Sequence, residues 1–190
     1  MTISFTPVDA QANDRAALIT FMTSNEFPFH VRTRPAAAQV EKMIDEGGFD
    51  DEDTKSFWID HDDLGHIGTL SLEDLTDPTP LFDLRLGTKF RGHGLGKAIL
   101  AAATKLVFTT MEATRFEGQT REDNYPMRAT FLACGWVKEA HYREAWPTED
   151  GAVASVAYAI LRRDWESGTS TPVPWDDFNP GQQARSNTLP

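Results

Sequence analysis

The chain has 190 residues, of which 18 are Lys or Arg and 29 are Asp or Glu, so its formal net charge at neutral pH is −11. Such acidity argues against general nucleic-acid binding; it either favours a cationic substrate or serves only to keep the protein soluble. The single cysteine, Cys134, excludes an internal disulfide and a zinc site made of several cysteines. Because neither a membrane-length apolar run nor a basic-then-apolar leader is visible, we expect one cytoplasmic globular domain.

Hydrophobic periodicity and turn residues predict the secondary structure in chain order. The expected elements are a strand at 3–8, a helix from 13 or 14 to 24, a helix that begins near Pro35 and stops at Gly47-Gly48, strands at 56–59 and 66–72, an extended run at 81–86, a helix whose apolar face runs from Leu95 to Met111, a strand at 115–120, a helix at 124–133, and strands at 136–146 and 152–161. Two pairs of these strands are expected to form hairpins, 56–59 with 66–72 and 136–146 with 152–161.

This alternation of strands and helices is typical of a mixed sheet with helices packed on it. The composition changes at Glu166, after which Pro, Gly, Ser and Thr dominate. We therefore expect a folded domain at 1–165 and a tail at 166–190, to which Trp175 and Phe178 would add anchoring contacts.

The stretch from Leu84 to Lys97 combines an extended run, a glycine-rich turn and the start of a helix. Gly92, Gly94 and Gly96 lack a β-carbon, so the backbone there can adopt unusual dihedral angles and approach a ligand closely. The first turn of a helix offers free N–H groups and the positive end of its dipole. The pattern therefore predicts an anion site, most simply for the phosphates of a nucleotide-type ligand.

Two motifs make the sequence resemble the Gcn5-related N-acetyltransferase (GNAT) superfamily. The signature Arg, two residues, Gly, one residue, Gly is met by Arg91, Gly94 and Gly96, and Asn124 is followed eleven residues later by Gly135-Trp136. Matching aliphatic and aromatic positions before the turn are Leu84, Leu86 and Phe90. The resemblance covers about residues 3–162 and implies an α+β fold, with a central mixed, mostly antiparallel twisted sheet and helices on both faces.

The resemblance also implies roles for individual residues, with acetyl-CoA as the cosubstrate. Backbone groups of Leu84, Arg85 and Leu86 would hold the pantetheine arm and the acetyl carbonyl, and Asn124 would hydrogen-bond the same arm. The pyrophosphate would lie against backbone N–H groups, with added charge from the Arg and Lys side chains. The residues concerned are Arg91, Gly92, His93, Gly94, Leu95, Gly96 and Lys97.

The sequence departs from the family pattern at two acid–base positions. Phe131 stands where many members have a tyrosine that protonates the leaving thiolate, and Gln119 stands where a glutamate is common, with Glu117 nearby. The segment after Asn124 is similar to the RimJ/RimL-like branch, in which that tyrosine is often absent. Water, Tyr125 or Tyr142 would then protonate the thiolate.

The acceptor side rests on three candidate residues. Asp83, on the strand expected to line the acyl site, either orients or deprotonates an ammonium group, or is a structural partner of Arg85. Phe29 and His30 follow the first helix, where family members build part of the acceptor pocket; packing in the core is the alternative. His66 has no companion ligands, so we predict no metal site, and Cys134 is expected to be a buried structural thiol.

The predicted function is acetyl-CoA-dependent N-acetylation of a primary amine. Net acidity and Asp83 favour a small polycationic acceptor such as an aminoglycoside antibiotic of the kasugamycin type, which would make the enzyme a resistance factor. Acetylation of protein N-termini, as in the RimJ/RimL-like branch, and a non-catalytic acyl-CoA-binding module remain alternatives. We expect a monomer or homodimer, with neither a nucleic-acid nor a membrane partner.

Overall fold

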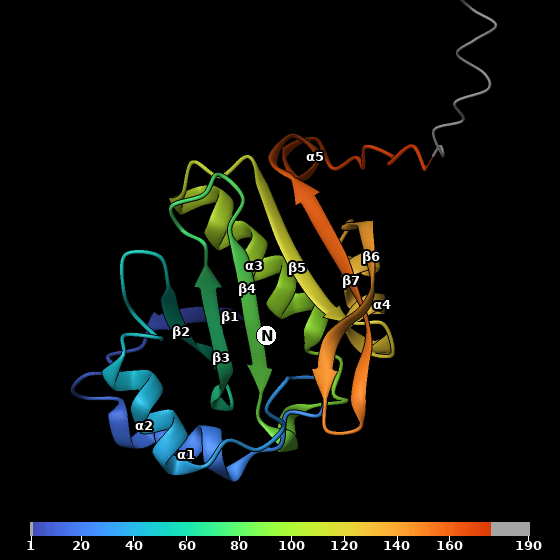
Figure 1. Ribbon diagram of the computed structural model, residues 1–190. Helices are drawn as coiled ribbons and strands as arrows, with labels where there is room; N and C mark the ends of the chain where they lie inside the picture. Colours follow the sequence, from blue (N-terminus) through green and yellow to red (C-terminus); the bar gives the residue numbers. More distant parts are fainter. Residues whose placement is uncertain (1, 176–190) are drawn as a thin grey trace, which may run out of the picture.

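Two antiparallel sheets form the centre of the computed structural model, which describes residues 2–175 (Figure 1). The first sheet has the strand order β1-β2-β3-β4 and consists of β1 (Ile3–Pro7), β2 (Lys55–His61), β3 (Gly65–Glu73) and β4 (Leu81–Leu86). The second has the order β5-β7-β6 and consists of β5 (Arg115–Arg121), β6 (Val137–Thr148) and β7 (Gly151–Leu161). Both predicted hairpins are confirmed, because β2 pairs with β3 and β6 with β7.

Helices cover both faces of the first sheet because successive side chains of a strand point to opposite faces. Trp58 of β2 shares a buried cluster with residues of the first two helices, whereas its neighbours Phe57 and Ile59 share one with the central helix. The helices are α1 (Arg15–Ser24), α2 (Ala37–Asp45), α3 (Gly96–Thr110), α4 (Tyr125–Ala133) and α5 (Arg162–Ser167), with a 3-10 turn η1 (Thr88–Phe90). The predicted α+β fold with helices on both faces is therefore confirmed.

The predicted apolar face of α3 is the main contact between the helix and the sheets. Its fully buried members are Ile99, Leu100, Ala103 and Val107, and the structure adds Thr104 and Phe108. Burial of a large aliphatic side chain contributes about 1.5–3 kcal/mol, so this stripe fixes α3 against the strands. The position of α3 in turn fixes the glycine turn that precedes it.

The two sheets meet at β4 and β5, which run in the same direction (Figure 1). The N–H of Glu117 donates to the carbonyl oxygen of Pro80 at 3.1 Å, and the N–H of Thr114 donates to that of Pro78 at 3.2 Å. Beyond these bonds the strands diverge toward their carboxyl ends (Figure 1). The expected single central sheet is thus two ladders with an opening between them.

The chain beyond β7 contains a helix that the sequence analysis did not predict. α5 extends to Ser167, past the proposed boundary at residue 165, and Asp164 accepts hydrogen bonds from the N–H and the hydroxyl of Thr171, both at 2.8 Å. Trp175 is 63% exposed, which argues against anchoring through that residue. Phe178 lies outside the described residues. No helix in the described range is long and apolar enough to cross a membrane.

Candidate active site

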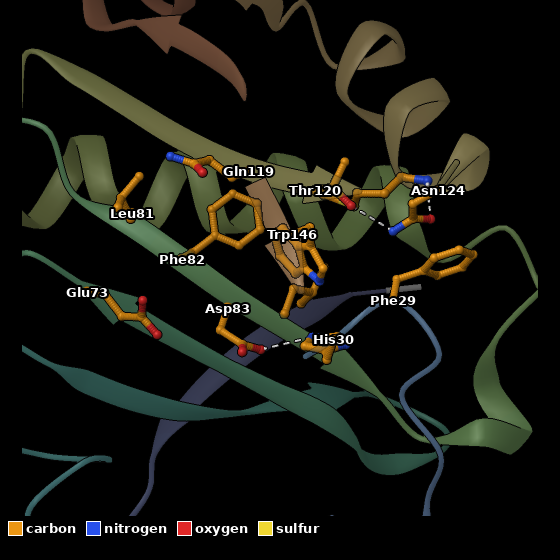
Figure 2. Close-up of a pocket in the computed structure, with 12 residues that line it drawn as sticks. Phe29, His30, Glu73, Leu81, Phe82, Asp83, Gln119, Thr120, Asn124 and Trp146 are labelled. Atoms are coloured by element: carbon orange, nitrogen blue, oxygen red, sulfur yellow. Dashed lines mark hydrogen bonds and ion pairs between the residues drawn. The ribbon is translucent and has the colours of Figure 1, made fainter. Parts of the chain in front are cut away.

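A cavity of ≈ 270 Å³ lies in the opening between β4 and β5. Figure 2 shows side chains that enter it from β3, β4, β5, the start of α4, β6 and the segment before α2. The lining residues are Phe29, His30, Glu73, Leu81, Phe82, Asp83, Leu84, Gln119, Thr120, Asn124, Met127 and Trp146. The structure therefore brings together five of the predicted site residues, namely Phe29, His30, Asp83, Leu84 and Asn124.

The segment that carries Phe29 and His30 is irregular, and contacts from other elements hold it in place. The side-chain oxygen of Asn25 accepts a 2.7 Å hydrogen bond from the N–H of Thr88 in η1. Arg121 of β5 donates to the carbonyl oxygen of Pro28 at 3.2 Å, and its guanidinium lies 5.6 Å from the centre of the Phe29 ring. The wall of the cavity is thereby tied to η1 and to the second sheet.

The carboxylate of Asp83 has a partner for each oxygen. Oδ1 lies 3.2 Å from Nε2 of His30 (Figure 2), and Oδ2 accepts a 2.7 Å hydrogen bond from Nη2 of Arg85. Burial opposes ionisation, but the hydrogen bond and charge of His30 and then the charge of Arg85 outweigh it and hold the pKa of Asp83 well below its usual range. Asp83 is therefore a permanent negative charge and a poor acceptor for a proton.

Glu73 is a second acidic residue of the cavity, and sequence reasoning missed it. It lies at the end of β3, opposite Leu81 of β4, in the register that also pairs Ser71 with Asp83. Side chains of paired residues share one face of the sheet, so the two carboxylates line the same wall. Burial, and then the charge of Asp83, raise the pKa of Glu73. Only the strand register, which no local pattern encodes, would have identified it.

Trp146 also lines the cavity, and the hairpin of β6 and β7 supplies it. Its Nε1 is buried and has no hydrogen-bond partner in the described part of the chain.

Glu117, which the sequence analysis considered near Gln119, is absent from the lining residues and is paired elsewhere. Arg115 donates to Glu117 at 2.5 Å and to Glu139 at 2.6 Å.

The backbone N–H and C=O groups of β4 face the opening between β4 and β5 at every second residue. The N–H of Gly87 donates to the carbonyl oxygen of Ile67 in β3, directly opposite in the register. In an antiparallel strand, the N–H and C=O groups of successive residues point to opposite neighbours. Those of Arg85 therefore also point toward β3, whereas those of Leu84 and Leu86 point toward β5. Leu84 and Leu86 can therefore hold a ligand between the strands, and the backbone of Arg85 is committed to the sheet.

Asn124 is the N-cap of α4 and faces the cavity. Its Oδ1 accepts from the N–H of Met127 at 3.3 Å, and its Nδ2 donates to the hydroxyl of Thr120 at 2.9 Å (Figure 2). A carboxamide has a second N–H and a second lone pair. Asn124 can therefore hold a ligand without losing its role as a helix cap.

The glycine turn has the form of an anion cradle. Gly92 and Gly94 have φ values of +78° and +76°, which side chains with a β-carbon rarely adopt. In the described chain, the N–H groups of residues 92–98 donate to no backbone carbonyl and to no side chain. Free N–H groups at the start of a 15-residue helix are well suited to bind a pyrophosphate.

The ring of Phe131 belongs to the core rather than to the chemistry. It is fully buried and stacks on Tyr158 with ring centres 4.7 Å apart. Tyr125 and Tyr142 are 70% and 43% exposed, and neither lines the cavity. The structure thus offers no tyrosine among the lining residues for protonation of a thiolate.

The other histidines and the cysteine lie outside the cavity. His93 is exposed on the glycine turn, and His66 stacks on Trp58. Cys134 is half-buried rather than buried, and burial raises the pKa of its thiol. Among the described residues, no group of His, Cys, Asp and Glu side chains could hold a metal ion.

Comparison with known proteins gives one family match. The sequence profile described as acetyltransferase (GNAT) domain matches residues 4–137. No sequence among curated proteins matches this chain.

Solved structures give several fold matches. A chimera of the spermidine N-acetyltransferase SpeG from Vibrio cholerae and hSSAT has a TM-score of 0.75 at 14% identity, over 87% of this chain and 99% of that one. The Vibrio cholerae enzyme in complex with CoA and spermine has a TM-score of 0.71 at 14% identity, over 87% and 98%. Its dodecameric structure in an intermediate state has a TM-score of 0.70 at 13% identity, over 86% and 96%.

Proposed function

Because this chain belongs to the family of acetyltransferase (GNAT) domains, we propose that it transfers an acetyl group from acetyl-CoA to a primary amine of a slender polycation. The chain is an N-acetyltransferase, and acetyl-CoA is its cosubstrate. The acceptor is the part that the family does not specify. The pair of carboxylates in one small cavity is the observation that carries our choice of acceptor.

The donor would extend from the glycine turn into the opening between β4 and β5. The free N–H groups of residues 92–98 would bind its pyrophosphate, with Lys97 exposed beside them. The backbone of Leu84 and Leu86 and the carboxamide of Asn124 would orient the pantetheine arm. This geometry would place the thioester beside the acidic wall, within reach of a bound amine.

The acceptor would bind against Glu73 and Asp83. Two carboxylates favour a ligand with more than one positive charge, and the net charge of −11 would attract such a ligand. The volume of ≈ 270 Å³ is below the range of about 300–1,000 Å³ that drug-sized ligands occupy. An aliphatic polyamine that enters end-first therefore fits better than the whole ring system of an aminoglycoside. The fold matches with spermidine N-acetyltransferases agree with this choice.

The test is the release of free thiol from acetyl-CoA in the presence of spermidine, spermine, aminoglycosides including kasugamycin, and peptides with free N-termini. We expect the highest kcat/KM with the linear polyamines, and a strong fall at high salt because the attraction is electrostatic. Turnover only with aminoglycosides would exclude the polyamine while retaining the polycation. Turnover only with peptides would overturn the proposal. Binding of acetyl-CoA without any turnover would indicate a non-catalytic module.

A further inference from the structure

His30 and Asp83 form a pair whose parts come from different regions of the chain. Nε2 of His30 lies 3.2 Å from Oδ1 of Asp83, and Arg85 holds the other carboxylate oxygen at 2.7 Å. Arg85 itself is fixed, with its guanidinium 5.0 Å from the centre of the Phe27 ring. Phe27 also packs edge-to-face on the imidazole, with ring centres 5.7 Å apart. The imidazole therefore has a defined orientation at the wall of the cavity.

The pair determines which nitrogen of His30 carries the lone pair. An ionised carboxylate can only accept hydrogen bonds, so Nε2 must carry the hydrogen that faces Asp83. In the neutral imidazole, Nδ1 is then the acceptor. Nδ1 is buried and has no partner among the described residues, although a buried polar atom normally has one. His30 lines the cavity, so it brings to that wall one basic nitrogen whose lone pair no described residue uses.

The charged groups around His30 leave it as the candidate base. Asp83 and Arg85 face it from β4, Glu73 lines the same cavity from β3, and Arg121 approaches the segment from β5 through Pro28 and Phe29. Within the segment itself, Arg34 and Glu26 pair with each other at 3.2 Å. Arg85 holds one oxygen of Asp83, and the other oxygen contacts Nε2 of His30 and so holds the imidazole in place.

We propose that Nδ1 of His30 accepts the proton that the ammonium group of the acceptor must lose, with Asp83 as the residue that positions the ring. The proposal rests on the proposed acetyl transfer. His30 is then the catalytic base and Asp83 a positioning residue. The arrangement follows the general logic of an oriented base, in which a carboxylate fixes the tautomer of an imidazole.

The proton balance of the reaction assigns one proton to His30. The acceptor enters as an ammonium ion and gives a first proton to Nδ1, which leaves a free lone pair on the amine nitrogen of the acceptor. That lone pair forms the C–N bond to the carbonyl carbon of the thioester. When the C–S bond breaks, its electrons leave with the sulfur of CoA, and the second proton from nitrogen ends on that sulfur. His30 then returns its proton to solvent. The products are the amide, CoA thiol and one proton.

The test measures kcat and KM for the amine against pH in the wild type, His30→Gln and Asp83→Asn. Because general base catalysis contributes about 100- to 10,000-fold, we expect His30→Gln to lower kcat at least 100-fold and to abolish the acidic limb of the pH profile. Asp83→Asn should lower kcat less and change that limb, since the imidazole then loses the carboxylate that orients it. The matched control is His141→Gln, because His141 also pairs with a carboxylate, that of Glu122 at 3.1 Å, but outside the cavity.

Chemical rescue separates a catalytic from a structural role. His30→Ala leaves space for a free imidazole, and added imidazole should restore turnover in proportion to its concentration without changing KM for acetyl-CoA. No rescue, together with an unchanged pH profile of His30→Gln, would overturn the assignment of His30 while wild-type turnover still supported the proposed function. An unchanged profile in Asp83→Asn would remove the positioning role. Absence of turnover in the wild type would instead contradict the proposed function itself.

Discussion

Arg121 donates from Nη1 to the carbonyl oxygen of Pro28 at 3.2 Å, across 93 residues of sequence. Its Nε and Nη2 hold the carboxylate of Asp123 at 2.9 and 2.6 Å, so the guanidinium is fixed on both sides. One residue at the end of β5 therefore joins the second sheet to the segment that supplies His30. This wall of the cavity depends on the long-range bond, because that segment has no regular secondary structure of its own.

Replacement of Arg121 should impair acceptor binding. In Arg121→Gln the bond to Pro28 is lost, and we expect KM for the amine to rise about tenfold, since a charged hydrogen bond contributes roughly 1.5–3 kcal/mol. KM for acetyl-CoA should stay within twofold. The control is Arg34→Gln in the same segment, where an exposed pair with Glu26 at 3.2 Å contributes little. Equal effects of the two substitutions would contradict the bridging role.

Replacement of Gly94 should weaken binding of the cosubstrate. Its φ of +76° makes an alanine there strained by about 1–2 kcal/mol, so the turn would shift and its N–H groups would lose their alignment. We expect the Kd for CoA, measured by calorimetry, to rise at least tenfold in Gly94→Ala.

Gly65→Ala is the matched control for that experiment. Gly65 has a φ of +69° and equally open space for a β-carbon, but it is the first residue of β3, directly after the turn from β2. The two variants should lose similar stability, and only Gly94→Ala should lose affinity. A similar loss of affinity in both would show that strain, rather than the cradle, is the cause.

The two carboxylates of the cavity should affect stability in opposite directions. The folded state lowers the pKa of Asp83 below 3.8. The contribution of this carboxylate to the free energy of unfolding is therefore complete above that pH and is lost as pH falls through the folded pKa. Asp83→Asn should therefore lower the free energy of unfolding at pH 7, by about 1–3 kcal/mol for a half-buried carboxylate whose partners are left unpaired. Urea unfolding from pH 3 to 7 measures this difference, which should remain until the pH is below about 4.

Glu73 should behave in the opposite way. Burial raises its pKa above 4.5, so ionisation costs stability as pH rises through that value toward the folded pKa. Glu73→Gln should therefore be more stable than the wild type at pH 7 and equal to it near pH 4. The same variant should have a higher KM for a polycation, because stability gained at a binding site commonly costs function. A destabilised Glu73→Gln at pH 7 would contradict this account.

Arg162 should contribute strongly to stability although it lies outside the cavity. It donates at 2.6–2.8 Å to three carbonyl oxygens at and beyond the C-terminal end of α3, those of Phe108, Met111 and Ala113. We expect Arg162→Ala to lose about 2–4 kcal/mol, since a cation at a helix C-terminus satisfies carbonyls and opposes the dipole. The midpoint of thermal unfolding should fall by several degrees. Arg163→Ala, at an exposed neighbouring position, should change it little.

The elements and the geometry of the glycine turn could be predicted because their causes are local. The positive φ at Gly92 and Gly94, the cap at Asn124 and the apolar stripe of α3 each depend on residues close in the sequence. α5 was missed because its first residue, Arg162, is held by a hydrogen bond to the end of α3, which is distant in the sequence. The ends of β6 and β7 were also missed, because the pairing of the two strands extends to Thr148 and Gly151.

The sequence by itself determined the order of elements, the family signature and the form of the glycine turn, because turn dihedrals and helix periodicity are properties of short stretches. Only the tertiary structure decided the cavity and its lining. The register of β3 on β4 brings Glu73 beside Asp83, the divergence of β4 and β5 opens the cavity, and Arg121 holds the segment of His30 against it. These relations join residues that are far apart in the chain, and their formation depends on packing of the whole domain.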